Sequence, residues 1–339
     1  RGLTRNEIAG AMGMTPGQIK YAMAQRGPIV KDRTPQASPR PTFTRPPSAS
    51  RDIDTLLTDM ASAYKRKQAH SEGKGRIEVK VPSKGAFLLM FIGDPHLGDP
   101  GCDIEYLTWC LETARTTPDC YPVNMGDLAN FWAGRLSRLY AHQPTTDDEE
   151  TSLVDWLVRS FPWAWVIQGN HDKWGPVVSL VCDKHDVMAV SHGGFFHVRN
   201  QAGGEIKIDC RHTHRGNSQY NPAFAQTKRS YRGSPADIIV GAHIHTGAYT
   251  LLRNGVTGLV NHCLRVGAFK KYDEYADANS FDNDNVGPVM CAVCRPSESD
   301  PLKRVTTFAD VEDAITFLNA VKGRSEEHTS ELQSLRHIS

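Results

Sequence analysis

The clearest hydrophobic pattern in the chain is the uninterrupted apolar run AFLLMFI at 86–92, which is followed directly by Gly-Asp. A run of this kind and length is typical of a strand buried on both faces. The preceding RIEVKV at 76–81 alternates apolar and polar positions, which predicts an edge strand. Similar β-like runs recur up to about residue 295, so most of the chain is predicted to be one sheet-containing domain.

Helical patterns occur in two stretches of the first 70 residues, 3–27 and 52–68. Residues 3–27 predict two short helices with a turn at Gly13, because Thr15, Pro16 and Gln18 form the typical start of a second helix. This segment resembles the helix-turn-helix of DNA-binding proteins, with a plain packing hairpin as the alternative. Apolar residues at helical spacing predict an amphipathic helix over 52–68.

Composition sets the expected boundaries. Residues 28–50 are rich in Pro, Ser and Thr, which predicts an extended linker without a core. Near the end, RSEEHTSELQS resembles the translation of a sequencing-library adapter, so we expect a non-native tail and exclude its histidines, His328 and His337. The predicted parts are a helix-turn-helix-like segment (1–27), the linker (28–50), a helix and edge strand (51–80), the main domain (81–321) and the tail (322–339).

Charge is unevenly distributed although the net charge of the 339 residues is only +1. Residues 1–80 hold 15 Lys/Arg against 7 Asp/Glu, and the remainder holds 24 against 31. A basic leader on an acidic body favours contact with a polyanion, and we expect that partner to be DNA. The longest apolar run is far too short for a membrane span, and no signal-peptide pattern is present, so we expect a cytoplasmic protein of a bacterium or phage-infected cell. The chain starts with Arg, so we expect its natural start to lie upstream.

Eight cysteines are scattered along the chain. In a chain this long they are expected to be reduced thiols rather than a disulfide framework. Cys291 and Cys294 form a CxxC pair, but no second pair completes a zinc site, so a buried structural role is predicted for both.

Chemistry-bearing residues follow the β-like runs at intervals of 31 to 43 residues. The earlier intervals suit strand–helix–strand units, whose strands end at a common edge, whereas the later ones suit β-hairpins equally well. Glycines directly before Asp94, Asp127 and Asn170 are expected to permit sharp turns. The candidate residues are Asp94, His96, Asp127, Asn170, His171, Asp172, His212, His214, His243 and His245.

These residue types select the kind of ligand. Asp and Asn offer oxygen, His offers nitrogen, and no thiolate is included, so the set suits Mn, Fe or Zn better than a structural zinc cage. In an extended segment, Asp94 and His96 point to the same side, as do His243 and His245. Each such pair is therefore able to hold an ion from one segment.

The ordered segments GDPH, GDLAN, GNHD, RHTH and HIH resemble the calcineurin-like metallophosphoesterase superfamily, in particular its phage-type members, over roughly residues 87–270. The resemblance implies an α/β fold: a four-layer α/β/β/α sandwich with mixed sheets, preceded here by the small helical segment. Ala242 stands where the family usually has Gly, which is a small departure.

The resemblance also implies two divalent metal ions, with Mn as the first expectation and Fe or Zn as alternatives. Asp94, His96 and His245 would hold one ion, Asn170 and His243 would hold the other, and Asp127 would bridge them. A histidine of RHTH would complete the second site, and we favour His212 over His214. His192 is the least favoured candidate for this position.

Two further residues receive catalytic roles from the resemblance. His171 would contact the substrate phosphate and assist the leaving group as an acid, and Asp172 would orient His171. Asn130 either supports the metal loop or caps a helix, and both readings stay open. Leu136, Leu139 and Tyr140 in NFWAGRLSRLY are expected to pack inward from a helix, although a nucleic-acid groove is an alternative.

The predicted activity is phosphoester hydrolysis at a dinuclear centre by a metal-bridging hydroxide. Because fold does not select the substrate, the basic leader is the argument for a DNA-acting phosphodiesterase or nuclease. A small-molecule phosphomonoesterase or nucleotidase is the alternative, and a non-catalytic DNA-binding protein is a third reading.

Overall fold

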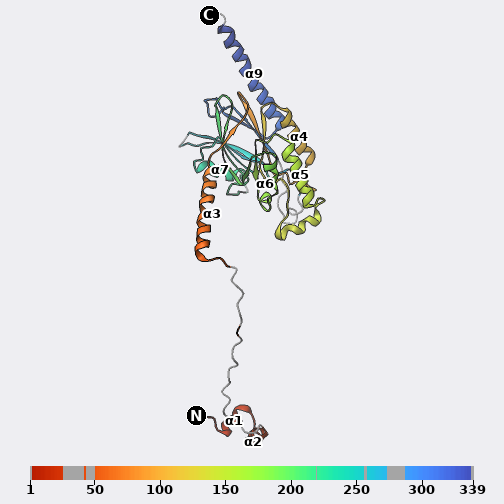
Figure 1. Cartoon of the computed structure of the whole chain (residues 1–339), viewed down its shortest axis with the longest axis vertical. Helices are drawn as coiled ribbons and strands as arrows, with labels where there is room; N and C mark the ends of the chain where they lie inside the picture. The colour runs from red at the N-terminus through yellow and green to blue at the C-terminus, as the bar shows by residue number, and fades with distance from the viewer. Residues whose placement is uncertain are drawn as a thin grey trace. The chain divides into compact units, whose positions relative to one another are not determined.

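The computed structural model describes residues 2–25, 42, 50–218, 220–255, 258–272 and 287–336, with side chains up to residue 323 (Figure 1). The chain forms two compact units, Arg1–Ala61 and Ser62–Ser339. Apart from residues 42 and 50, the predicted linker 28–50 lies outside the described residues. Among the described residues, no helix combines the length and apolar character that crossing a bilayer requires.

The first unit confirms the two predicted N-terminal helices, α1 (Arg5–Met12) and α2 (Pro16–Gln25). The Thr4 hydroxyl accepts from the backbone of Glu7, and the Glu7 carboxylate accepts in return from the backbone of Thr4. Thr15 and Gln18 form the same reciprocal pair at the start of α2. Gly13 lies between the helices at φ +63°, the left-handed conformation that glycine adopts without strain.

Helix α3 (Ile53–Gly73) confirms the helix predicted over 52–68 and continues five residues further. Its apolar side chains are not buried. Ile53, Leu57, Met60 and Tyr64 each expose more than half of their surface. The spacing therefore predicted the helix correctly, whereas the burial that such spacing usually indicates is absent from the structure.

The first sheet of the second unit has the order β12-β11-β2-β3-β4-β5. Strands β2 (Phe87–Ile92), β3 (Cys120–Asn124), β4 (Trp165–Gln168) and β5 (Ala189–Ser191) are parallel. Helices α4 (Ile104–Thr116), α5 (Asp147–Ser160) and α6 (Val177–Lys184) connect them, as the intervals predicted. Strands β11 (Val289–Cys294) and β12 (Val305–Phe308) add an antiparallel margin.

The second sheet has the order β1-β6-β7-β8-β10-β9. The predicted edge strand β1 (Ile77–Lys80) pairs in parallel with β6 (Gly193–Arg199), which forms a hairpin with β7 (Glu205–Arg211). Helix α7 (Phe224–Tyr231) then leads to β8 (Ile238–Gly241), parallel to β7. Strands β9 (Ala248–Arg253) and β10 (Val260–Arg265) complete this mixed sheet.

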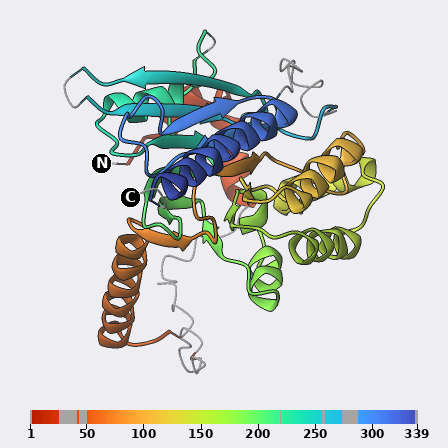
Figure 2. The ribbon, with the colours of Figure 1, turned by 90° about the horizontal axis from the view of Figure 1, so that it is seen from above.

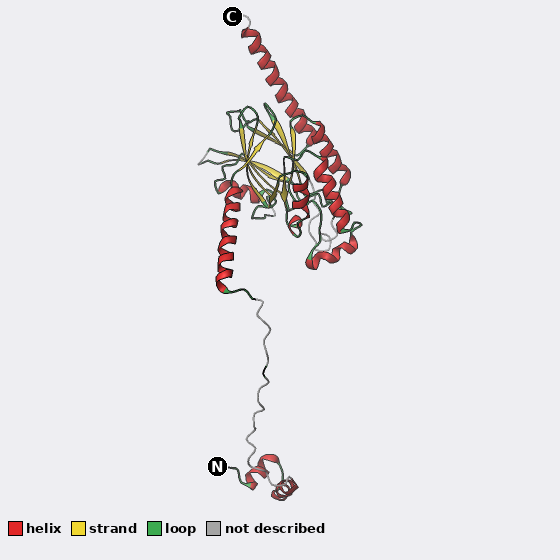
Figure 3. Cartoon of the chain, viewed as in Figure 1, coloured by secondary structure: helices red, strands yellow, loops and turns green. Residues whose placement is uncertain are grey.

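The two sheets pack face to face, with helices outside them (Figures 2 and 3). Trp165 of one sheet stacks on Phe196 of the other, with ring centroids 4.4 Å apart. Helices α4, α5, α6 and α9 (Val311–Arg336) cover the first sheet, and α7 covers the second. This arrangement confirms the predicted four-layer α/β/β/α sandwich with mixed sheets.

All eight cysteines are free thiols, and seven of them are buried. Cys291 and Cys294 both lie on β11 with fully buried side chains. Burial raises the pKa of Cys120 and Cys182 to about 12, which makes these thiols unreactive at neutral pH. The predicted burial of Cys291 and Cys294 is confirmed.

Candidate metal centre

The candidate ligands lie just beyond the carboxyl ends of strands in both sheets. Asp94, Asp127 and Asn170 follow β2, β3 and β4, which are neighbouring parallel strands and therefore end at one edge. His212 and His243 follow β7 and β8, which are neighbours in the facing sheet. The two sheets thus deliver their ligand loops to a common place, as expected for crevices at strand carboxyl ends.

Three of these residues have left-handed backbone conformations, with φ of 47° at His96, 52° at Asp127 and 72° at His243. Such angles are uncommon for residues other than glycine and cost free energy that the surrounding structure must supply. Strained positions of this kind occur often at binding and active sites, where the surrounding structure holds them in place.

The glycines before the ligands serve two different purposes. Gly126 has φ +111°, so it confirms the predicted sharp turn before Asp127. Gly93 and Gly169 are required by close approach instead. A Cβ on Gly93 would lie 1.8 Å from the carbonyl oxygen of Gly267, and one on Gly169 would lie 2.1 Å from the Asp127 carboxylate. For these two the expected reason was wrong, because the constraint comes from residues distant in sequence.

The structure assembles the predicted ligands into two groups. Asp94, His96 and His245 form the first, and Asp127, His212 and His243 form the second. Within each group the ligand atoms lie within 4.8 Å of one another. Asn170 joins the second group, because its Oδ1 lies 3.1 Å from His212 Nε2. All seven predicted ligands therefore converge.

His212 connects the two groups. Its Nε2 lies 3.2 Å from Asp127 Oδ2, and its Nδ1 lies 3.9 Å from Asp94 Oδ1. Burial lowers the pKa of His212, but the two carboxylates outweigh burial and raise this pKa to about 10. Burial raises the pKa of Asp127, but the charge of His212 and of the neighbouring imidazoles outweighs burial, and the pKa falls below its ordinary value. Burial raises the pKa of Asp94 well above its ordinary value, because the partners within the chain do not compensate its charged form. A bound cation would stabilise both carboxylates in their charged form.

The hydrogen bonds of the imidazoles fit metal binding. His96 Nδ1 donates to Asn130 Oδ1 at 2.8 Å, and its buried Nε2 has no hydrogen-bond partner among the described residues. Asp94 Oδ1 is buried and equally without a hydrogen-bond partner there. Burial, followed by the charge of His171, lowers the pKa of His96 well below its ordinary value, so its ring is neutral. Buried polar atoms left unpaired are costly, and a cation would satisfy both of them.

His171 lies beside these groups in an aromatic setting. Its Nδ1 donates to the backbone carbonyl of Asn130 at 2.5 Å. Its ring centroid is 4.2 Å from that of Trp174, 5.2 Å from that of Trp132 and 5.0 Å from that of His96. Burial lowers the pKa of His171, with the Asp127 charge opposing it. Trp132 belongs to the segment 130–140, for which a nucleic-acid groove was the alternative prediction, whereas Trp174 was assigned no role although it follows His171 by only three residues.

Asp172 does not orient His171. Its carboxylate accepts backbone N–H groups of Asp127, Leu128 and Gly169, at 2.8, 3.0 and 2.8 Å. Burial and the charge of Asp127 raise the pKa of Asp172 to about 7. Asp172 therefore joins the Asp127 loop to the GNHD loop, and the carbonyl of Asn130 has the orienting role that Asp172 was expected to have.

The side chain of Asn130 supports the candidate ligand His96 and does not cap a helix. This distinguishes the two roles that the sequence left open. Besides binding His96, its side chain donates to Asp99 and Gln143 at 2.8 Å each. Its backbone N–H donates to Glu150, a fully buried carboxylate of α5 that also accepts from Tyr140. Glu150 was missed because it lies in the run DDEE, which is typical of a solvated helix start.

The segment after Asn130 forms a 3₁₀ helix, Gly134–His142, rather than an α-helix. Leu136, Leu139 and Tyr140 are partly buried on it, as expected, while the two arginines are exposed. Trp132, the aromatic residue of this segment whose ring lies against His171, precedes the helix.

The structure also separates the competing histidines. His212 joins the second group, whereas His214 is buried and its Nε2 hydrogen bonds with the carbonyl of Val240 at 3.1 Å. On an extended strand His212 and His214 would face the same way, but β7 ends at Arg211, directly before them. His192 is exposed and lies outside both groups.

Fold and site together define a class: an α/β/β/α sandwich with two adjoining His/Asp groups able to hold metal ions. No protein-family model matches the sequence, and neither does any curated protein.

Solved structures with a similar fold include Vps29 from Cryptosporidium parvum (15% identity, TM-score 0.35, covering 66% of this chain and 98% of that chain). A calcineurin-like phosphoesterase, YfkN, from Bacillus subtilis has 11% identity and a TM-score of 0.36, covering 74% and 99%. A predicted phosphoesterase from Streptococcus pneumoniae TIGR4 has 13% identity and a TM-score of 0.31, covering 67% and 99%. Similarity this distant does not indicate what the present chain binds or hydrolyses.

Proposed function

We propose that this protein is a metal-dependent phosphoester hydrolase with a dinuclear centre that acts on phosphodiesters, in particular those of DNA. The observation that carries the proposal is the convergence of Asp94, His96 and His245 with Asp127, His212 and His243 at one edge of the fold. His171 lies directly beside them. Oxygen and nitrogen donors without thiolate suit catalytic Mn, Fe or Zn.

The ligand residues would hold two divalent ions, with Asn170 completing the second site and Asp127 serving both. When bound, two such ions lower the pKa of a water molecule and neutralise charge on the phosphate oxygens. Buried Asp172 keeps the Asp127 and GNHD loops together through its three backbone hydrogen bonds, so that the ligands stay in register.

His171 is the group positioned to act on the leaving oxygen. The hydrogen bond from Nδ1 to the Asn130 carbonyl fixes the ring and leaves Nε2 for the substrate. The negative charge of a bound phosphate would favour the protonated ring, whose Nε2–H would then donate to the phosphate or the leaving oxygen. Trp132 and Trp174 limit water access around His171 and supply aromatic surface for a nucleobase to stack on. The basic sequence of residues 1–80 and the two-helix unit also favour a DNA substrate.

A comparison of substrates tests this proposal. The purified chain is incubated with Mn²⁺ and bis-p-nitrophenyl phosphate, p-nitrophenyl phosphate, or single- or double-stranded DNA. We expect hydrolysis of the diester and of DNA. Cleavage of the monoester alone would favour a small-molecule phosphomonoesterase, and no hydrolysis with any of several divalent metals would contradict an enzymatic role.

A further inference from the structure

A second feature of the Ser62–Ser339 unit is a cleft of about 790 Å³ beside the metal centre. It is bounded by the last turns of α3, the junction of β5 with β6, strand β7 and helix α7. We call it the basic cleft, because six of its lining residues are Lys or Arg and none is Asp or Glu among the residues the structure describes. The six are Lys67, Lys74, Arg76, Lys207, Arg211 and Arg229.

Helix α3 presents a continuous row to this cleft. Lys67, His70 and Ser71 are spaced i, i+3 and i+4 on α3, so they share one face, and Lys74 follows in the turn directly after the helix ends at Gly73. Lys65 does not line the cleft. The backbone N–H of Lys74 still donates to the carbonyl of His70, as in a helix, so the seven steps from Lys67 to Lys74 cover about 10 Å along the helix axis. Phosphates along one strand of a duplex advance about 3.4 Å each, so this row is long enough to meet more than one phosphate.

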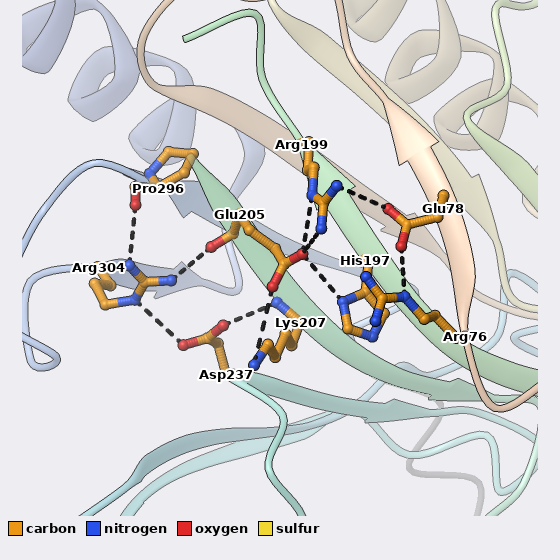
Figure 4. A network of polar contacts seen from close by, with 9 residues as sticks. All are labelled: Arg76, Glu78, His197, Arg199, Glu205, Lys207, Asp237, Pro296 and Arg304. Carbon is orange, nitrogen blue, oxygen red and sulfur yellow. Dashed lines mark hydrogen bonds and ion pairs between the residues drawn. The ribbon is translucent and has the colours of Figure 1, made fainter. Parts of the chain in front are cut away.

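The positive charge of the basic cleft is only partly neutralised. Three carboxylates at its border pair with the lining cations: Asp209 with Arg211 and Arg229, Glu205 with Lys207, and Glu78 with Arg76. Glu78 and Glu205 also pair with Arg199, which lies outside the lining (Figure 4). Six cations therefore exceed the available carboxylates, and burial together with the charges of Arg211, Lys173 and Lys67 lowers the pKa of Lys74.

Backbone hydrogen bonds connect the lining of the basic cleft to the metal centre. The amide of His212 donates to the carbonyl of His192 at 3.2 Å, and the amide of His192 donates to the carbonyl of Gln168 at 2.9 Å. Gln168 leads directly into Gly169 and the ligand Asn170, and the Lys74 ammonium donates to the carbonyl of Ser191. A chain lying in the basic cleft would therefore continue towards the ligand groups.

We propose that the basic cleft binds the phosphate backbone of a nucleic-acid strand next to the bond to be hydrolysed, an inference that rests on the proposed function. Arginine forks on the sheet side, such as Arg211, match phosphate oxygens, and Lys67 and Lys74 add point charges from the opposite wall. Phe195 contributes a partly exposed aromatic ring to the lining. The concave shape admits a single chain, whereas a flat membrane surface could not reach residues on both walls.

The test compares two double variants of the full chain that lose equal charge. Lys67→Ala/Arg76→Ala removes two cations of the basic cleft. Lys65→Ala/Lys80→Ala removes two exposed lysines from the same helix and the adjoining strand, neither of which lines the cleft. Binding of a fluorescein-labelled single-stranded 20-nucleotide DNA is measured by anisotropy in EDTA over a range of salt concentrations. Hydrolysis of bis-p-nitrophenyl phosphate with Mn²⁺ is measured in parallel.

We expect the cleft variant to bind DNA at least about tenfold more weakly and to lose about two units of the slope of log K against log salt. The control variant should keep the affinity and the slope of the unmodified chain. Both variants should hydrolyse the small diester at the normal rate, because it does not extend into the basic cleft.

The outcomes separate this inference from the proposed function. Equal DNA binding and equal salt slopes in the two variants would overturn the inference, even with diester hydrolysis intact. Loss of DNA binding only in the cleft variant would support the inference, even if the unmodified chain hydrolysed no diester and the proposed function failed. Displacement of the DNA by polyglutamate at equal charge concentration would show that an acidic polypeptide fits equally well, and would overturn the choice of nucleic acid.

Discussion

The metal centre and the basic cleft adjoin each other but place charge in opposite ways. The metal centre holds fully buried carboxylates with specific partners. Asp94, for example, is 0% exposed and accepts from the backbone N–H of His243. The basic cleft holds partly exposed cations, two of which, Arg211 and Arg229, share the carboxylate of Asp209. Buried charge is expensive unless paired, whereas exposed charge is screened by water and salt. Single changes should therefore have large effects at the centre and graded effects in the cleft.

The largest expected effect comes from Asp127→Asn. Replacing this buried carboxylate removes the negative charge closest to His212, so metal bound per chain and Mn²⁺-dependent diester hydrolysis should both fall by more than about a hundredfold. Metal analysis of the purified protein and the diester assay measure this. Asp119→Asn is the matched control, because Asp119 also has a positive φ but lies in a surface loop and pairs with Lys322. Normal metal content in Asp127→Asn would contradict the assigned ligand role.

His171→Asn separates chemistry from metal binding. His171 is not one of the ligands, so metal content should persist, while turnover should fall by about 10²- to 10⁴-fold, as is typical for loss of an acid–base group. His185→Asn, which changes a histidine at the end of α6 that pairs with Asp155 and lines neither site, should leave turnover normal. Full activity of His171→Asn with bound metal would show that the leaving group needs no help from this imidazole.

Asn130→Ala probes the support beneath the centre. The change removes the acceptor of His96 Nδ1 and two bonds to Asp99 and Gln143. Loss of such a supporting partner typically costs about 10- to 100-fold in metal affinity. Competition with a metal-sensitive dye measures the affinity. An unchanged value would mean that the buried position of His96 alone holds its ring.

The smallest effect concerns a buried histidine outside the centre. His262 on β10 contacts Thr307 at 2.8 Å, and burial lowers its pKa to about 4, with Asp237 opposing. Its pKa is lower in the folded than in the unfolded chain, so the unfolded chain binds the proton first as pH falls from about 6.5 to 4, and stability is lost there. At pH 5 this amounts to about 2 kcal/mol. Urea unfolding at pH 7 and 5 should show a smaller pH dependence for His262→Asn than for the unmodified chain. An equal dependence in both would assign the effect to other groups.

Patterns among neighbouring residues were sufficient to predict much of this fold. The apolar run of β2, the alternation of β1 and the reciprocal caps of Thr4 and Thr15 depend on residues within a few positions of one another. The choice of His212 agrees with the structure, although His212 and His214 lie beyond the end of β7 rather than on a strand. The role of Asp172 was misassigned because its partners include backbone groups 44 and 45 residues away.

The order and chemical types of the ligands, the strands that precede them and the helices at the start of the chain were determined by the sequence itself, because each depends on neighbouring residues. Only the tertiary structure brought the buried Glu150 beneath Asn130, placed Trp132 against His171 and closed the basic cleft between α3 and the second sheet. These relations arise where separate segments pack together. Their contacts depend on the relative positions of whole strands and helices, which no local pattern of residues encodes.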